Sequence, residues 1–339
     1  MQKHNLVAID LAKNVFQVCG MSRHQKVTFN KQLRRHELVE FMLHQPPVAV
    51  AMEACYSSHY WARCFEAMGH TVKLLPAQHV APFVRGNKSD HNDAVAIAEA
   101  ARRPNIRPVP IKTVDQQDIQ ALHRLRERYV ANRTGLINQT RGLLSEYGII
   151  APLGHKAFCR LLRETSQPTA TQLSPLLKVQ LNQIADEYYG LTDRIAELTD
   201  TLAQTARKNP LCQLLMTLPG IGVINTTAIV SAIGNGSQFS SGRDLAVWLG
   251  LTPRQSGSGE KFKSSGITRR GNRYLRKQLI HGARAALSRC KKKTDQLSRW
   301  VNQLVARRGV PKATVALAAR LARLIWVLLQ RQQVYKAMP

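Results

Sequence analysis

A run of apolar residues at alternating spacings of four and three is the feature that most restricts the fold of this chain. The run is uninterrupted and consists of Leu177, Leu181, Ile184, Tyr188, Leu191, Ile195, Leu198 and Leu202. This spacing places its members on one stripe of a long α-helix and is the a/d pattern of a coiled-coil seam. We therefore expect a long helix here, with a partner helix packed along the stripe.

A second, weaker run at heptad-compatible spacings precedes the first. Its members include two polar residues: Leu122, Leu125, Tyr129, Asn132, Leu136, Gln139, Leu143 and Tyr147. The two runs predict either an antiparallel hairpin within one chain or a dimerisation arm, since a heptad does not say whether its partner is in the same chain. Five arginines on the earlier segment could grip an RNA stem or face solvent: Arg124, Arg126, Arg128, Arg133 and Arg141.

The residues before this arm have the pattern of an α/β unit. Short apolar segments typical of strands cover residues 6–10, 15–21, 26–29, 48–53 and 71–75. Segments typical of helices lie between and after the later strands. Three strands followed by alternating helix and strand favour a mixed sheet with helices on its faces.

Pro210 separates the arm from a C-terminal segment with a mainly helical pattern. The expected fold class is therefore α/β plus all-α, in three parts. These are an α/β domain at residues 1–110, a long-helix coiled-coil arm at 111–209 and a helical domain at 210–339.

The charge of the chain indicates a polyanionic partner. It has 49 Lys and Arg against 21 Asp and Glu, a formal net charge of +28, and residues 243–339 hold +19 of it. Such an excess favours nucleic acid over a small metabolite. The six cysteines form no CxxC pair, which excludes a zinc ribbon and predicts reduced thiols in the cytoplasm. Arg320 and Arg323 interrupt the most apolar stretch, so we expect no membrane span.

Four acidic residues stand at positions that favour a metal site. Asp10 and Glu53 each end an apolar strand, and Asp90 and Asp93 lie three apart at the start of a predicted helix. Ligands of open α/β sheets bind at the carboxyl edge of the strands. Carboxylates that converge there can share Mg²⁺ ions for phosphodiester chemistry. Taken singly, each acid has an ordinary explanation as a turn cap, a surface ion pair or a first-turn acid.

Two further motifs lie in the basic C-terminal third. Leu218-Pro-Gly-Ile-Gly222 resembles a helix-hairpin-helix turn, whose glycine amides contact phosphate, although a plain corner between helices is an equal alternative. The Gly- and Ser-rich residues 256–267 stand next to arginines that could stabilise attack by a serine on a phosphodiester. From composition alone, a solvated hairpin with serines in its turn is favoured.

Motifs along nearly the whole chain resemble one family. Ala8-Ile-Asp-Leu-Ala12, Ala51-Met-Glu-Ala54 and Lys88-Ser-Asp-His-Asn-Asp-Ala94 together resemble the DEDD signature of a RuvC-like, RNase H-type domain. The later motifs resemble the C-terminal domain of the DEDD/serine transposases of bacterial insertion sequences, relatives of Piv-type invertases. They are Leu218-Pro-Gly-Ile-Gly222, Phe239-Ser-Ser-Gly-Arg243, Trp248-Leu-Gly-Leu-Thr-Pro-Arg254 and Gly271-Asn-Arg-Tyr-Leu-Arg276.

The resemblance implies an RNA-guided DNA transposase of the bacterial cytoplasm and nucleoid. A structured non-coding RNA, the bridge RNA, would pair with double-stranded donor and target DNA, and a dimer or tetramer would form composite active sites. The resemblance makes the acids Mg²⁺ ligands, with Mn²⁺ as an alternative: Asp10, Glu53, Asp90 and Asp93. It also implies a serine that joins transiently to DNA. Counted back from Gly266, that serine is Ser258, with Ser256 as second choice.

Two other functions compete with this one. A metal-dependent endonuclease of the Holliday-junction type would use only the four acids and water. An architectural nucleic-acid binder would use neither the acids nor a serine.

Overall fold

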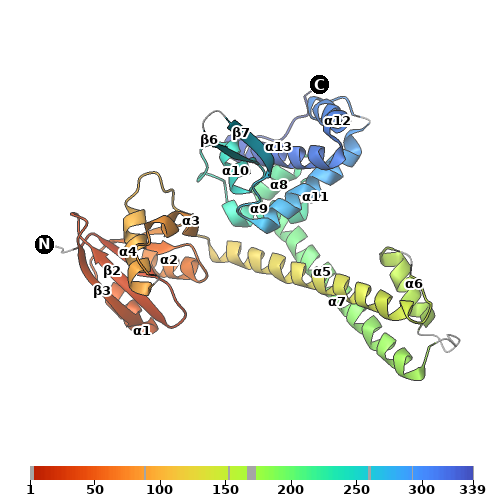
Figure 1. Ribbon diagram of the computed structural model, residues 1–339, viewed down its shortest axis with the longest axis horizontal. Coiled ribbons are helices and arrows are strands. Elements are labelled where there is room, and N and C mark those ends of the chain that lie inside the picture. The colour runs from red at the N-terminus through yellow and green to blue at the C-terminus, as the bar shows by residue number, and fades with distance from the viewer. Residues whose placement is uncertain are drawn as a thin grey trace. The chain divides into compact units, whose positions relative to one another are not determined.

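The computed structural model describes residues 4–87, 89–151, 153–165, 173–258, 261–291 and 293–338, and only the backbone of 258 and 261–264 (Figure 1). The chain divides into two compact units after Val114, and each is described by itself. This division falls close to the boundary expected at residue 110. The further boundary expected at residue 209 stays a prediction.

A five-stranded mixed sheet forms the first unit, as expected from the sequence. Its strands are β1 (Leu6–Asp10), β2 (Val15–Met21), β3 (Val27–Arg34), β4 (Ala49–Glu53) and β5 (Thr71–Leu75). The order is β3-β2-β1-β4-β5. The first three strands pair antiparallel, whereas β4 lies parallel to both β1 and β5.

Helices cover both faces of this sheet (Figure 1). They are α1 (Arg35–Leu43), α2 (Ser58–Ala67), α3 (Ala77–Val80), the short 3₁₀ helix η1 (Ala81–Phe83) and α4 (Asp90–Ala101). Val7 and Ile9 of β1 pack with α1 and α2, whereas Leu6 and Ala8 pack with α4. Since successive side chains of a strand point to opposite faces, burial of both faces explains the continuous apolar run of β1.

The second unit is mostly helical. Its elements are α5 (Val114–Ser145), α6 (His155–Thr165), α7 (Pro175–Lys208), α8 (Pro210–Met216), α9 (Val223–Ile233), α10 (Gly242–Trp248), β6 (Pro253–Ser258), β7 (Lys261–Ile267), α11 (Arg273–Cys290), α12 (Gln296–Arg308) and α13 (Val310–Arg331). Strands β6 and β7 pair antiparallel as an isolated hairpin. The helical C-terminal region confirms the expected fold class.

Helix α13 is the central helix of the C-terminal core. Its buried residues include Leu317, Leu321 and Ile325, which join a cluster with residues of α8 to α12. By length and composition alone the helix is apolar enough to cross a membrane, and half of its most apolar window is buried in the protein. A helix surrounded by other helices is apolar on most of its circumference, which accounts for this composition.

The long helices α5 and α7 lie side by side and antiparallel within the chain. Arg126 Nε donates to Thr199 Oγ1 at 2.8 Å, and Arg133 Nη1 donates to Thr192 Oγ1 at 3.3 Å. Two of the five arginines therefore contact the neighbouring helix. These contacts favour the hairpin interpretation of the arm, whereas a supercoiled seam stays a prediction.

The predicted stripe is buried on α7 but only in part on α5. On α7, the residues from Leu181 to Leu202 in the stripe are buried or half-buried. On α5, Leu125 and Leu143 are 40% and 42% exposed, so they do not pack in a seam within the chain, and a seam with a second copy stays a prediction. The buried face of α5 consists of His123, Leu136, Thr140 and Leu144. Of these four residues the predicted run contains only Leu136, because two of the others, His123 and Thr140, are polar.

The first turns of α5 are fixed to the C-terminal helices by polar side chains. Gln116 and Gln120 donate to the backbone oxygens of Val230 and Ser231, which lie in the last turn of α9. Carbonyl groups in a last turn lack partners within their own helix. The two glutamines add donors at the end of α9, where the Val230 oxygen also accepts from the backbone N–H of Gly234.

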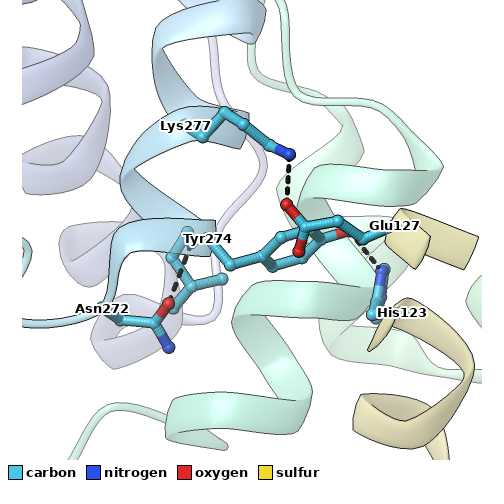
Figure 2. A network of polar contacts seen from close by, with 6 residues as sticks. His123, Glu127, Asn272, Tyr274 and Lys277 are labelled. Atoms are coloured by element: carbon cyan, nitrogen blue, oxygen red, sulfur yellow. Dashed lines mark hydrogen bonds and ion pairs between the residues drawn. The ribbon is translucent and has the colours of Figure 1, made fainter. Parts of the chain in front are cut away.

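His123 extends this contact to α11 (Figure 2). Its Nε2 lies 3.0 Å from Thr227 Oγ1, and its Nδ1 lies 2.9 Å from the hydroxyl of Tyr274. Because the Thr227 hydroxyl donates to a backbone oxygen, it accepts from Nε2–H, and Nδ1 accepts from Tyr274. An ion pair between Glu127 of α5 and Lys277 of α11 lies beside His123 and Tyr274.

A close approach of two glycines joins the α8–α9 turn to α11. Gly220 has φ +80°, and a Cβ there would lie 2.2 Å from the backbone oxygen of Gly282. The side chain of Asn225 donates to the backbone oxygen of Gly220 at 3.0 Å. The turn at Leu218-Pro-Gly-Ile-Gly222 is thus packed against a helix on the Gly220 side, as a corner between helices would be.

We expect Gly220→Ala to lower the free energy of unfolding by about 2 kcal/mol or more, through left-handed strain and the backbone clash. The control is Gly190→Ala, because Gly190 lies in helix α7 with nothing near its added Cβ, and alanine there stabilises a helix. Urea unfolding of the two variants measures both effects. Equal effects of the two substitutions would contradict the packing described.

The second prediction concerns acid stability. Burial, with a smaller contribution from Arg126, lowers the pKa of His123 to about 4, whereas an unfolded histidine titrates near pH 6.5. Between these values the unfolded chain binds a proton that the folded chain does not, so stability is lost as the pH falls from about 6.5 through 4. We expect His123 to account for a loss of about 2 kcal/mol between pH 7 and pH 5.

Urea unfolding of wild type and His123→Gln at the two pH values tests this expectation. Glutamine can keep a donor and an acceptor but cannot be charged, so the variant should lose less stability on acidification. All other titrating groups are shared and cancel in the comparison. The same pH dependence in both proteins would show that His123 is not buried as described.

Candidate active site

Three of the four predicted acids lie together, where the alternation of side chains along β1 turns Asp10 toward the start of α4. Asp10 has the same parity along β1 as Leu6 and Ala8, which face α4. Asp90 and Asp93 lie in the first turn of α4. One carboxylate oxygen from each of Asp10, Asp90 and Asp93 lies within 4.8 Å of the others. The edge of the sheet and the start of one helix thus form a cluster of three carboxylates.

Glu53 stands beside this cluster. It ends β4, in the same parity as Ala49 and Ala51, which also pack on the α4 side. Its charge contributes to raising the pKa of Asp10, although it is not among the three acids whose oxygens converge. The side chain is half-buried. Glu53 is therefore electrostatically part of the site.

The electrostatics of Asp10 show the repulsion in this cluster. Burial, followed by the charges of Asp93, Asp90 and Glu53, raises its pKa to about 6. Two of these effects, desolvation and neighbouring negative charge, both disfavour the ionised carboxylate. A bound cation would offset both effects, because it favours the ionised form of the carboxylates. Three oxygen donors close together are the ligand type that Mg²⁺ prefers, so the residues present fit a divalent ion.

Two polar residues that the sequence analysis missed hold the start of α4 in place. Gln17 lies opposite Asp10 in the β1–β2 pair and is buried, and its side chain donates to Asn30 Oδ1. Asn30 Nδ2 then donates to the backbone oxygen of His91 at 3.1 Å. This chain of contacts fixes the first turn of α4 against the sheet. A glutamine within the apolar strand Val-Phe-Gln-Val was the available signal.

The N-cap of α4 adds a second restraint. Ser89 Oγ accepts from the backbone N–H of Asn92, as an N-cap residue does. The side chain of Asn92 in turn donates to the backbone oxygen of Asn87 at 2.8 Å. The motif around Asp90 and Asp93 therefore contains the residues that begin the helix as well as the acids.

The predicted serines lie in the β6–β7 hairpin of the second unit. Ser256 pairs with Lys263 across the hairpin and is exposed. Ser258 ends β6 and pairs with Lys261 through the backbone, and its side chain lies outside the described residues. The glycine and acid that follow, Gly259 and Glu260, also lie outside them.

Two glycines and one arginine fix the foot of this hairpin. A Cβ on Gly250 would lie 2.2 Å from the backbone oxygen of Arg270, and a Cβ on Gly271 would lie 1.9 Å from that of Trp248. Only residues without a side chain allow these two turns to pass so closely. The buried Arg276 donates from Nη1 to the backbone oxygens of Leu249 and Arg270. Two of the motifs noted in the sequence thus pack directly on each other.

Two parts of the chain match known protein families. Residues 7–149 match the profile of a DEDD-type domain described as a transposase, and residues 212–299 match that of "Transposase IS116/IS110/IS902 family". The first match covers the acidic cluster, and the second covers the β6–β7 hairpin and its foot.

Relatives match over nearly the full length. A "Probable family 20 transposase" of Pseudomonas aeruginosa is 44% identical over 97% of this chain and 98% of its own. The transposase for insertion sequence element IS1111A of Coxiella burnetii is 41% identical over 99% and 92%. The pilin gene-inverting protein of Moraxella bovis is 26% identical over 81% and 80%, a more distant relation. The chain belongs to the IS116/IS110/IS902 family of transposases and carries its DEDD-type N-terminal domain.

Proposed function

We propose that this transposase cuts and rejoins DNA strands with a serine nucleophile and a divalent metal site. The metal ligands would be Asp10, Glu53, Asp90 and Asp93, and the nucleophile would be Ser258, with Ser256 as second choice. The observation that carries the proposal is the convergence of three carboxylates, and burial together with the neighbouring charges raises the pKa of Asp10. Mg²⁺ or Mn²⁺ at this site would supply positive charge next to a phosphodiester.

The residues of the hairpin suit the second part of the proposal. The serine hydroxyl would attack phosphorus, forming a serine–phosphate ester while the bond to the departing deoxyribose oxygen breaks. The serine proton would leave and a proton would be taken up by that oxygen. Arg269, Arg270 and Arg273 at the foot of the hairpin are exposed, and their charges would stabilise the phosphorane.

RNA guidance and assembly belong to the same proposal. We infer a structured non-coding RNA that pairs with donor and target DNA, and a dimer or tetramer at work in the bacterial cytoplasm at the nucleoid. The excess of positive charge after residue 243 suits both kinds of nucleic acid. The exposed Leu125 and Leu143 on α5 offer apolar contact area to a second copy.

The metal site has a test that does not depend on activity. We expect Mg²⁺ or Mn²⁺ to raise the melting temperature of the wild type by several degrees, because a ligand that binds only the folded state stabilises it. Asp10→Asn should abolish this rise. Without metal at pH 8, the variant should be at least as stable as the wild type, because one of the repelling charges is gone.

The matched control for the metal test is Glu66→Gln, which removes an exposed acid of α2 in the same unit. It should keep the full response to metal. A rise in melting temperature that persists in Asp10→Asn would place the metal elsewhere.

The serine has a separate test. Purified protein is mixed with labelled, nicked donor DNA, the non-coding RNA that flanks the gene, and Mg²⁺, and is resolved on a denaturing gel. We expect a slow-migrating covalent band that is lost in Ser258→Ala and Asp10→Asn but retained in Ser256→Ala. Ser237→Ala, an exposed loop serine, is the control.

The other outcomes of this gel are equally informative. Loss of the band in Ser256→Ala alone would move the nucleophile to Ser256. Cleaved DNA without a covalent band in any lane would replace the proposal with a metal-dependent endonuclease that uses the acids and water. A band that forms equally without the RNA would remove RNA guidance from the proposal.

A further inference from the structure

A cavity of about 890 Å³ lies at the foot of the β6–β7 hairpin. Its walls come from the hairpin itself and from α11, α12 and α13. We call it the hairpin-foot cavity and define it by Ile280, Trp300 and Ala316 on its apolar wall and Arg269, Arg276 and Arg323 on its charged wall. Its volume lies in the range of pockets that enclose a small organic ligand.

The charged groups of the cavity are all cationic. Lys312 joins the three arginines, and the described residues that line the cavity include no carboxylate. Charged side chains of one sign in a partly enclosed space attract a ligand of the other sign. The ligand therefore carries negative charge.

One of these cations is buried and has donors to spare. Arg276 is only 9% exposed. Its Nη1 group donates to the backbone oxygens of Leu249 and Arg270, whereas its Nε and Nη2 groups are not among the fully buried polar atoms of the described residues that lack a partner. A guanidinium held in place by backbone oxygens through one nitrogen keeps its remaining N–H groups for an anionic oxygen. The guanidinium lines the cavity, so an anionic oxygen entering there can accept from it.

The cavity also has an aromatic residue in its lining. Trp300 is half-buried and lines the cavity beside Ile280 of α11 and Ala316 of α13. The guanidinium of Arg320 lies 4.6 Å from the centre of the Trp300 ring. An indole with apolar neighbours is suited to stack on a planar ring, and stacking of this kind is tolerant of base identity.

We propose that the hairpin-foot cavity binds one unpaired nucleotide of the DNA strand, with its phosphate at Arg276 and Arg269 and its base against Trp300. An anionic ligand with a planar apolar part satisfies both walls at once. The inference rests on the proposed function for the choice of DNA. It extends that function by holding the nucleotide next to the strand that carries the serines. Extrusion of a base from a duplex is a known means of exposing a nucleotide to a protein pocket.

The test uses a single-stranded oligodeoxynucleotide that contains one 2-aminopurine, without metal and without the non-coding RNA. Binding to wild type should quench the 2-aminopurine fluorescence through stacking on the indole. Trp300→Leu keeps an apolar side chain for the core but removes the stacking surface. It should lose the quenching and weaken binding by roughly 10-fold. The Trp248→Leu control changes a partly exposed tryptophan that does not line the cavity, and it should behave as wild type.

A second variant guards against a folding defect in the first. Ala316→Leu fills the cavity from α13 with a good helix former and should also abolish the quenching. Circular dichroism of each variant shows whether the helices are intact. Quenching that survives in a folded Trp300→Leu or Ala316→Leu overturns the proposal. So does selective quenching of the matching oligoribonucleotide, which would assign the cavity to RNA.

This assay separates the inference from the proposed chemistry. It involves neither Asp10 nor the serines, so quenching without a covalent band supports the cavity and contradicts the nucleophile. A covalent band without quenching supports the nucleophile and contradicts the cavity.

Discussion

Burial of the sheet on both faces is the constraint on which the candidate active site depends. Helices α1 and α2 cover one face and α4 covers the other, so each residue of β1 and β4 has its side decided by parity. Asp10 and Glu53 fall on the α4 side for this reason. A shift of β1 by one residue would turn Asp10 away from Asp90 and Asp93 and would expose its apolar residues. The packing that stabilises the fold therefore also holds the acids together.

The ionised acids of the cluster destabilise the folded state that brings them together. Mutual repulsion and burial both raise the pKa of Asp10, which means that the ionised site costs stability in the absence of a cation. Hydrogen bonds around the site oppose this loss of stability. Gln17, Asn30 and Ser89 hold the beginning of α4 at the sheet edge through hydrogen bonds that do not involve the acids. Such an arrangement is preorganised for a ligand of positive charge.

The second unit adds close backbone contacts to its side-chain packing. Gly220 touches Gly282, and Gly250 and Gly271 let two turns cross at the foot of the hairpin. Arg276 then bridges the backbone oxygens of those turns from a buried position. The β6–β7 hairpin begins and ends at these contacts.

The stripe on α7 and the strand ends at Asp10 and Glu53 could be predicted because each depends on local periodicity alone. The buried face of α5 could not be predicted from local periodicity. Leu125 and Leu143 have the right spacing but face solvent, whereas His123 and Thr140 are buried because their polar atoms find partners on other elements or on the helix itself. Gln17 and Asn30 were missed for the same reason, since their partners are distant in the sequence.

The sequence by itself determined the α/β and helical parts of the chain, the four candidate acids and the charge that indicates nucleic acid. These follow from residue type and from periods of two and 3.6 residues, which any strand or helix obeys. Only the tertiary structure decided which acids converge, which face of α5 is buried and where a cavity with a buried arginine opens beside the hairpin. Each of these depends on the distance between side chains from different elements, and no local pattern specifies that distance.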